Sequence, residues 1–418
     1  MKSPFEALLE KPASTIPYRI PVSYALSKLF ERLAYYGFRS LIVLYMIDEV
    51  HALSKEKALD INGFFTGCLG LSMIFGGLLG DFVFGNRRAI LIGGIVQAIG
   101  AFLVLVPTYG MMLTGMALVI LGSGLHGSNI FSQFGKSFVH RLELLDSGFS
   151  GFYLALNIGA FLASIVIGYL GMEVGWAYGF ASAGVFSLLS IIPVWMNKLD
   201  PSDFSDDYTP PSSVFARLGL VLAIMLISAW FWVAYELTGP IQFDLQESLA
   251  ASDPNMPKSM WNSLNGLFLM PLLGGALVLR RYLIVNRWVV MAMGLGIAGG
   301  GFWILNQTVE PGFHAAIFIW FYLLMAVAET LLIPSTYAAI ARQVNPKYLA
   351  TAVGVIFAFL GWINKGISSL VGWFPEAHES LVSIAMGLVL VPAVGIGACL
   401  LILAQSKSRI GHGPDHRM

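Results

Sequence analysis

Long, uninterrupted runs of apolar residues make up most of this chain, and short polar stretches separate them. A membrane-spanning helix needs about 20 such residues, whereas the strands of a membrane barrel alternate apolar and polar positions. The runs here do not alternate, so they predict helices that satisfy their own backbone hydrogen bonds in lipid. We expect twelve transmembrane helices, at residues 21–47, 58–83, 88–107, 109–135, 147–171, 174–196, 214–239, 259–279, 287–305, 313–340, 348–373 and 381–405.

The charged residues support this interpretation and orient the chain. They make up 11% of the sequence, against about 25% in soluble domains. With the N-terminus in the cytoplasm, most of the 24 basic residues fall on the cytoplasmic side, and the opposite side holds Lys55, Lys57 and Lys258. By the positive-inside rule, this asymmetry predicts a multi-pass protein of the bacterial inner membrane with both termini cytoplasmic.

A polar stretch rich in Pro, Ser and Asp, residues 197–213, divides the chain. It predicts a cytoplasmic linker between a six-helix bundle at residues 1–196 and a second bundle with a short cytoplasmic tail at residues 214–418. A weak repeat supports two halves, because a Gly pair followed by Asn and Arg occurs in both Gly76–Arg88 and Gly274–Arg287. The predicted fold class is an all-α membrane protein with the major facilitator fold.

Three motifs carry a family resemblance. The first expected helix contains ERLAYYG at residues 31–37, followed by Arg39, and residues 152–159 and 231–236 read FYLALNIG and FWVAYE. These resemble the ExxERFxYYG, FYxxINxG and FWAxxEQ motifs of the proton-coupled oligopeptide transporters. The resemblance implies proton-coupled uptake of di- or tripeptides, or of peptide-like zwitterions, by alternating access.

The chain also departs from that family at informative positions. Lys28 replaces the first glutamate of the first motif, and the fourth-helix GNGLFKPN motif appears as GSGLHGSN at residues 122–129, so Gly127 replaces its lysine. In the family, the missing glutamate and lysine belong to proton coupling. His126, beside this glycine, could titrate near neutrality or serve as a hydrogen-bonded structural histidine.

A polar stripe follows the first expected helix. Helical spacing places six of its side chains on one face: Lys28, Glu31, Arg32, Tyr35, Tyr36 and Arg39. Because charges inside a membrane span almost always face a cavity or the bundle interior, the stripe predicts either a wall of the substrate cavity or a set of structural ion pairs.

A zwitterionic substrate suits the charges of the two halves. Its carboxylate would pair with Arg39, which can bind in a bidentate manner, and its ammonium would lie near Glu236 or Glu329. We expect hydrogen bonds and apolar walls from a further set of side chains, namely Tyr35, Tyr36, Tyr153, Asn157, Trp232 and Asn265.

For proton coupling, Glu31 is the leading proton carrier. Burial raises the pKa of a carboxylate and a nearby cation lowers it, so movement between the two environments would load and release a proton. We hypothesise that Lys28 acts as its partner in place of the lost lysine, with a static salt bridge as the alternative. Arg32 and Glu329 complete the expected coupling group, and Glu329 is the next candidate carrier.

Four charges are expected at gates or in structural pairs. Asp81 is expected to hold the cytoplasmic gate with Arg87 or Arg88 and a helix N-terminus. Lys365 lies in the middle of a span, so an ion pair with a second-half carboxylate such as Glu329 is expected.

The sequence contains no nucleophile–base pair, metal-ligand spacing or nucleotide-binding loop, so we expect no enzyme, cofactor or metal. The expected partners are a small peptide-like solute, protons and the lipid bilayer, with no nucleic acid, and the functional unit is expected to be a monomer. The alternative is a divergent major facilitator transporter of an amino acid, organic anion or siderophore-like metabolite, uncoupled or exporting. The extra positive charge of Lys28 favours an anionic ligand.

Overall fold

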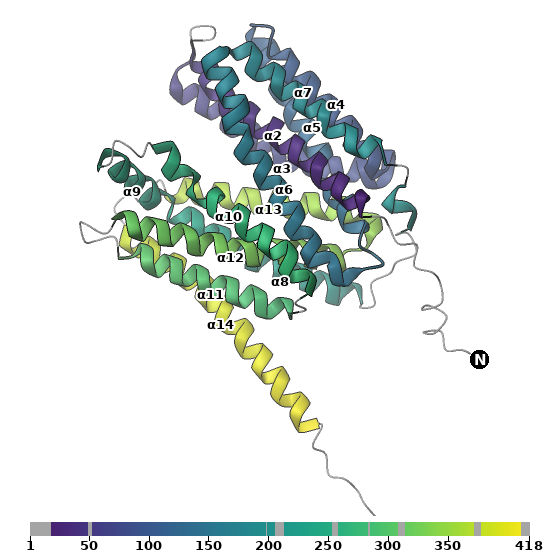
Figure 1. The fold of residues 1–418 in the computed structure, drawn as a ribbon, viewed down its shortest axis with the longest axis vertical. Coiled ribbons are helices and arrows are strands. Elements are labelled where there is room, and N and C mark those ends of the chain that lie inside the picture. The colour runs from purple at the N-terminus through teal and green to yellow at the C-terminus, as the bar shows by residue number, and fades with distance from the viewer. Residues whose placement is uncertain are drawn as a thin grey trace, which may run out of the picture. The chain divides into compact units, whose positions relative to one another are not determined.

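The computed structural model describes residues 18–48, 52–197, 199–204, 213–252, 258–282, 285–307, 314–371 and 378–410. Within these residues the regular secondary structure is helical and contains no strand (Figure 1). The fold is therefore all-α, as predicted.

The α-helices have the following bounds: α2 Arg19–Ile47, α3 Lys55–Leu79, α4 Asn86–Leu103, α5 Tyr109–Lys136, α6 Leu145–Ala163, α7 Trp176–Trp195, α8 Val214–Leu237, α9 Gly239–Ser252, α10 Lys258–Tyr282, α11 Arg287–Leu305, α12 His314–Gln343, α13 Leu349–Val371 and α14 His378–Ile410. Each predicted span overlaps one of these helices. A short π-helical segment, Gly80–Phe84, extends α3, and two more, Ser164–Gly168 and Leu170–Val174, extend α6. Helix α9 was not predicted.

Ten helices in the described part of the chain are long and apolar enough to cross a membrane. Helices α2 and α4 are outside this set for reasons visible in their sequences. Helix α2 carries the charged stripe, and α4 begins with the polar residues Asn86, Arg87 and Arg88. With these two helices included, the structure is consistent with the twelve predicted spans.

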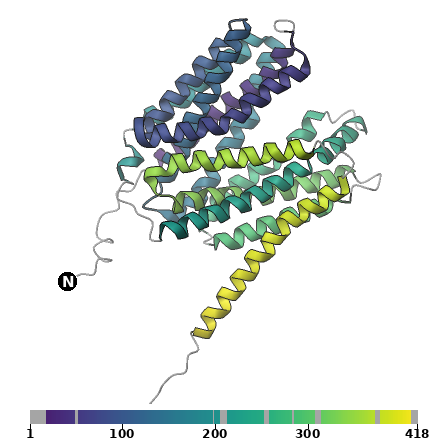
Figure 2. The ribbon, with the colours of Figure 1, turned by 180° about the vertical axis from the view of Figure 1, so that it is seen from behind.

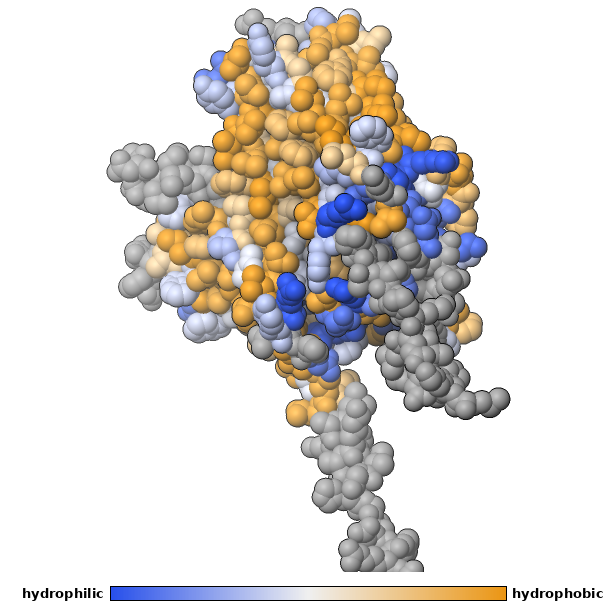
Figure 3. Space-filling model, turned by 45° about the vertical axis from the view of Figure 1, so that its right-hand side comes forward, coloured by the Kyte–Doolittle hydropathy of each residue, from blue (hydrophilic) through white to orange (hydrophobic). Residues whose placement is uncertain are grey.

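Large apolar side chains lie on the outside of the helices, where lipid would contact them. Phe64 on α3, Trp195 on α7 and Val391 on α14 are each more than half exposed. Figure 3 shows hydrophobic residues covering much of the visible helix surface. A water-soluble protein would bury most of such a surface.

The chain forms two compact units. Unit 1 contains residues 1–221 together with residues 338–361, and unit 2 contains residues 222–337 and 362–418. The predicted halves were continuous in sequence, whereas unit 1 also includes the end of α12 and the first part of α13.

Helices α4 and α5 of unit 1 pack closely because glycines face each other across their interface. A Cβ atom on Gly122 of α5 would lie 2.5 Å from the carbonyl oxygen of Gly93 on α4. A Cβ on Gly100 of α4 would lie 2.6 Å from the carbonyl oxygen of Gly115. Small residues allow backbones to approach in this way in membrane bundles, and the packing fixes α5, which carries residues 122–129.

In unit 2, Arg280 of α10 hydrogen-bonds to α12 close to a proline inside that helix. Pro334 lacks a backbone N–H, so the carbonyl of Thr330 loses its helical donor. The guanidinium of Arg280 donates to this carbonyl at 2.9 Å and to the carbonyl of Leu331 at 3.0 Å. Arg280 thus supplies the donor that Pro334 cannot give, at the residue directly after Glu329.

Helix α14 packs against α11 in unit 2. Figures 1 and 2 show α14 extending past the end of α11. Its apolar part, Ser380–Ile402, is long enough to span a membrane.

Candidate functional site

Glu31 lies at the centre of a buried charged cluster on α2. Lys28 donates from Nζ to Glu31 Oε2 at 2.9 Å. Arg32 binds both carboxylate oxygens, from Nε to Oε2 at 2.7 Å and from a terminal nitrogen to Oε1 at 2.6 Å. Glu31 is fully buried, and Lys28 is 6% exposed. Two cations therefore share one carboxylate, and the cluster carries one net positive charge in this ionised form.

Helix α5 contributes to the same cluster. The hydroxyl of Ser123 donates to Glu31 Oε1 at 2.8 Å and accepts from Arg32 at 3.0 Å. His126 Nδ1 lies 3.9 Å from Glu31 Oε2, and its Nε2 lies 3.2 Å from the hydroxyl of Ser27. Neither Ser27 nor Ser123 was predicted as a site residue. Ser27 lies one helical turn before Glu31, so helical spacing could have identified it.

The position of Gly127 bears on the hypothesis that Lys28 acts in place of the lysine of the fourth-helix motif. A Cβ atom built on Gly127 would lie 3.8 Å from Lys28 Nζ and 3.6 Å from Met73 Cε of α3. The ammonium of Lys28 thus lies beside position 127, where the motif that residues 122–129 resemble has a lysine. This proximity supports the hypothesis that Lys28 of α2 replaces that lysine of α5.

Two tyrosines extend the cluster along α2. The guanidinium carbon of Arg32 lies 4.8 Å from the ring centre of Tyr35 and 5.5 Å from that of Tyr36. The two rings meet edge to face at 5.5 Å. Both distances from Arg32 allow cation–π attraction, which holds the rings beside the charged cluster.

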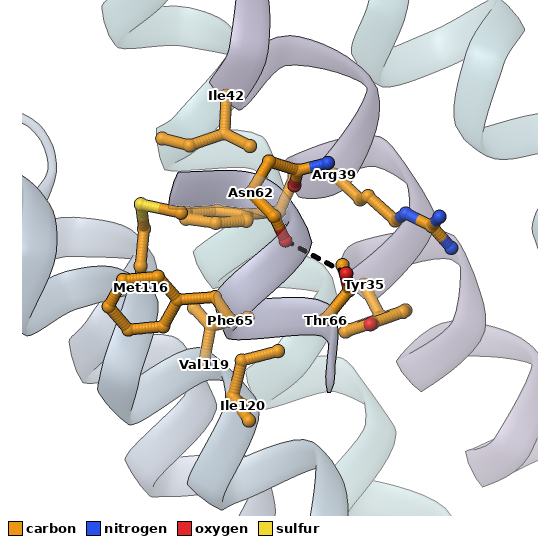
Figure 4. A pocket seen from close by; sticks show the side chains of 10 residues that line it. Tyr35, Arg39, Ile42, Asn62, Phe65, Thr66, Met116, Val119 and Ile120 are labelled. Atoms are coloured by element: carbon orange, nitrogen blue, oxygen red, sulfur yellow. Dashed lines mark hydrogen bonds between the residues drawn. The ribbon is translucent and has the colours of Figure 1, made fainter. Parts of the chain in front are cut away.

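A small pocket lies next along α2, between α3 and α5 (Figure 4). Its volume is about 20 Å³, which is room for roughly one water molecule. Tyr35 and Arg39 contribute to it from α2, and Asn62 and Thr66 contribute from α3. Figure 4 shows the Arg39 side chain pointing away from Met116, so its charge is directed away from the apolar wall. Arg39 is exposed.

Tyr153 and Asn157 lie on α6, which packs against α2. Tyr153 is buried. The side-chain amide of Asn157 donates to the backbone carbonyl of Tyr153, one turn earlier, at 2.8 Å. Its carbonyl oxygen retains acceptor capacity.

In unit 2, Asn265 of α10 and Glu329 of α12 come together. The amide of Asn265 donates to Glu329 Oε2 at 3.2 Å, and Glu329 is 5% exposed. Glu236 on α8 is half-buried. Lys365 lies in α13, but its side chain is outside the described residues, so its expected pairing remains a prediction.

Aromatic and amide side chains form a second polar group in unit 2. Tyr322 of α12 donates to Gln242 of α9 at 2.8 Å, and Gln246 donates to the Tyr322 hydroxyl at 3.4 Å. The rings of Trp232 and Tyr235 on α8 meet edge to face at 6.1 Å. The two glutamines were missed because α9 was not predicted. Tyr322 lies seven residues before Glu329, on the same helical face.

A third polar group surrounds Asp81 in unit 1. Asn86 donates to Asp81 Oδ1 at 2.9 Å and to Asn129 at 2.8 Å, and it accepts from Lys136 at 2.6 Å. Asp81 Oδ2 accepts from the backbone N–H of Thr351 at 2.7 Å and from its hydroxyl at 2.8 Å. Because Thr351 lies in the first turn of α13, Asp81 caps this helix.

Arg87 was expected to hold a gate together with Asp81, but its hydrogen bonds go to α7 instead. It donates to the backbone carbonyls of Val194, Trp195 and Asn197, at the C-terminal end of α7. Carbonyls at a helix C-terminus carry the negative end of the helix dipole, so they attract a cation. Arg88 is exposed. The structure therefore places Asp81 at a helix N-terminus and Arg87 at a helix C-terminus.

Comparisons with known proteins agree with this architecture. The Major Facilitator Superfamily model matches residues 24–369. A peptide transporter of Yersinia enterocolitica is 32% identical over 174 residues, covering 40% of this chain and 34% of that protein. Dipeptide and tripeptide permease A of Escherichia coli strain K12 is 31% identical over 210 residues, covering 49% of this chain and 42% of the permease. The chain thus aligns with less than half the length of these relatives.

Solved structures extend the likeness over most of the chain. The crystal structure of a peptide transporter, POT, in complex with sulfate has a TM-score of 0.65 and 22% identity, covering 92% of this chain and 95% of that one. The human organic anion transporter MFSD10 has a TM-score of 0.68 and 14% identity, covering 90% and 99%. These structures show the fold. The named relatives confirm the resemblance to peptide transporters. The chain belongs to the Major Facilitator Superfamily.

Proposed function

We propose that this protein is a secondary active transporter that takes up di- or tripeptides, or peptide-like zwitterions, together with protons. The observation that carries the proposal is the buried Lys28–Glu31–Arg32 cluster in the middle of α2. Charges inside a membrane span are costly and mark substrate or proton routes. The peptide-transporting relatives give the substrate class, and the fold gives alternating access.

The substrate carboxylate would bind Arg39, whose planar guanidinium can hold it with two hydrogen bonds. The substrate ammonium would bind Glu329 or Glu236, and Asn265 would orient Glu329 by the observed hydrogen bond. Apolar walls and further hydrogen bonds would come from the remaining expected residues, Tyr35, Tyr36, Tyr153, Asn157 and Trp232. In transporters with two repeats, each repeat contributes to the substrate site.

Lys28, Glu31, Arg32 and Glu329 form the proposed coupling group. Lys28 takes the part of the lysine that related transporters carry at the position of Gly127. The short distance from Gly127 to Lys28 Nζ supports this assignment. Asp81, Arg87, Arg88 and Lys365 would act as structural or gating charges.

The proposed setting is the inner membrane, with both termini cytoplasmic and a functional monomer surrounded by lipid. The distribution of basic residues supports this orientation. Under it, the Asp81 group and the N-terminus of α13 lie on the cytoplasmic side.

The first test is uptake of labelled di-alanine into proteoliposomes, with and without an imposed inward proton gradient. We expect accumulation that requires the gradient. Arg39→Lys keeps the charge but loses the bidentate fork, so KM should rise by about tenfold, which is the effect of ~1.4 kcal/mol. Arg19→Lys, at an exposed arginine on the same helix, is the matched control and should match wild type. Absence of transport under both conditions would overturn the peptide assignment, and gradient-independent transport would overturn symport.

An organic anion is the alternative substrate, because Lys28 gives the α2 cluster an excess of positive charge. N-acetylated di-alanine separates the two substrates, since it keeps the carboxylate but lacks the ammonium. Peptide transport predicts that it competes poorly with di-alanine. Equal transport of both compounds would favour the anion.

A further inference from the structure

His126 is a buried titratable residue that the coupling group above does not use. Its side chain is fully buried between α5 and α2. Nε2 lies 3.2 Å from the Ser27 hydroxyl, whereas Nδ1 has no hydrogen-bond partner among the described residues and lies 3.9 Å from Glu31 Oε2. Buried polar atoms without a partner are rare in folded proteins, and such an atom facing a carboxylate requires an explanation.

Glu31 is poorly suited to release and take up a proton during the cycle. Its two cations, Lys28 and Arg32, belong to the same helix and move with it. When α2 moves relative to its neighbours, the carboxylate keeps both charges, so its environment changes little. His126 belongs to α5, so its distance from Glu31 does change when the two helices shift.

Resting on the function proposed above, we propose that His126 is the proton-binding residue of the coupling cycle and that Glu31 is the fixed anion that pairs with it. The neutral ring carries its hydrogen on Nε2, which donates to Ser27, and Nδ1 then directs a lone pair toward the carboxylate. A hydronium ion from the aqueous phase gives its proton to Nδ1: one O–H bond breaks, the N–H bond forms, and a water molecule is left. The resulting N–H can donate to Glu31 once the atoms approach by roughly 1 Å.

Lys28 can make room for this new ion pair. His126 and Lys28 face the same oxygen, Oε2 of Glu31. The space beside Gly127 has no side chain, and the nearest atoms to a Cβ there are Met73 Cε at 3.6 Å and Lys28 Nζ at 3.8 Å. The lysine ammonium can therefore swing past Gly127 as the imidazolium approaches Glu31. A lysine at position 127 would obstruct this movement.

Among the described residues, the charges that face His126 come from α2. They are Lys28, Glu31 and Arg32. The residues of α3 and α4 that pack against this part of α5, Met73 and Gly93, are uncharged. Protonation of His126 thus adds a second net positive charge to the cluster. That charge attracts the carboxylate of a peptide, and by linkage a bound carboxylate favours the proton equally.

The test compares two transport modes in His126→Gln. Glutamine can still hydrogen-bond to Ser27 but cannot take up a proton. Accumulation of di-alanine driven by a pH gradient should fall by at least about tenfold, whereas exchange of labelled for unlabelled di-alanine, which needs no net proton movement, should persist. His140→Gln, at an exposed histidine, should change neither mode. Gradient-driven accumulation in His126→Gln at the wild-type level would overturn the proposal.

A second measurement does not depend on the substrate. In wild-type protein with ¹³C-labelled histidine, the NMR signal that disappears in His126→Gln should titrate between about pH 5 and 8 and shift in Lys28→Ala. A signal that stays constant over this range would overturn the proposal. This result decides the question even if His126→Gln loses both transport modes. If wild-type protein does not exchange di-alanine, the proposed function fails, and the titration still decides whether His126 binds a proton.

Discussion

Two carboxylates in unit 1 are buried or half-buried in polar surroundings, but they are balanced in different ways. Glu31 pairs with two cations on its own helix, and a histidine on α5 approaches the same oxygen. Asp81 accepts from Asn86 and from the first turn of α13, whose residues lie far away in sequence. The first arrangement has excess positive charge, which a proton or a substrate can alter. The second has neutral donors and a helix N-terminus, which suit a structural contact.

The comparison predicts different consequences when each carboxylate is changed. Glu31→Gln removes the only described acidic partner of Lys28 and Arg32, so one buried and one largely buried cation lose their counter-charge. Loss of one partner from a buried pair typically costs about 3–5 kcal/mol. We expect a large fall in the thermal unfolding temperature in detergent and loss of both accumulation and exchange of di-alanine. Full proton-driven uptake in this variant would exclude Glu31 from the coupling group.

The hypothesis that Lys28 acts in place of a lysine at position 127 can be tested by removing the first lysine and introducing the second. Lys28→Ala should reduce gradient-driven uptake by about tenfold or more, because Glu31 keeps a single cation. The double variant with Lys28→Ala and Gly127→Lys should recover part of the loss, since position 127 adjoins the site of the Lys28 ammonium. Uptake assays on both variants measure this. Equal activity of the single and double variants would show that the two positions are not interchangeable.

Asp81→Ala should have a smaller and more local effect. Loss of a helix N-cap costs about 0.5–2 kcal/mol. We expect faster hydrogen exchange at the first turn of α13, near Thr351, with little change at α2. Asp81→Asn, which keeps an acceptor oxygen, is the control and should lie between the alanine variant and wild type. Unchanged exchange in Asp81→Ala would contradict the capping role.

The smallest effect on stability is expected at a second contact that residues 338–361 make within unit 1. Arg342 of α12 pairs with Asp146 of α6 at 2.7 Å, and both side chains are partly exposed. Exposed ion pairs contribute about 0–1 kcal/mol. Arg342→Gln should therefore shift the unfolding temperature less than Asp81→Ala does, and high salt should reduce the difference from wild type. A shift as large as that of Glu31→Gln would show that this pair is not a surface pair.

The polar stripe on α2 could be predicted from sequence because its spacing of three and four residues is local to one helix. The lysine at position 28 and the glycine at position 127 could also be recognised as departures from the family motifs, because motif spacing identifies both positions. The contacts of Ser123 and His126 with Glu31 depend on how α5 packs against α2, and no local pattern encodes that packing. The contact of Asp81 with Thr351 joins two distant segments, so spacing could not reveal it. Helix α9 was missed because its sequence is too short and polar to resemble a span.

The most direct test of the central claim, that peptide and proton enter together, uses proteoliposomes that enclose a pH-sensitive dye. Di-alanine is added outside, with no proton gradient at the start and with the membrane potential held at zero. We predict that the interior becomes more acidic as di-alanine enters, and that the acidification scales with the amount taken up. Entry of di-alanine with no change in internal pH would contradict the account.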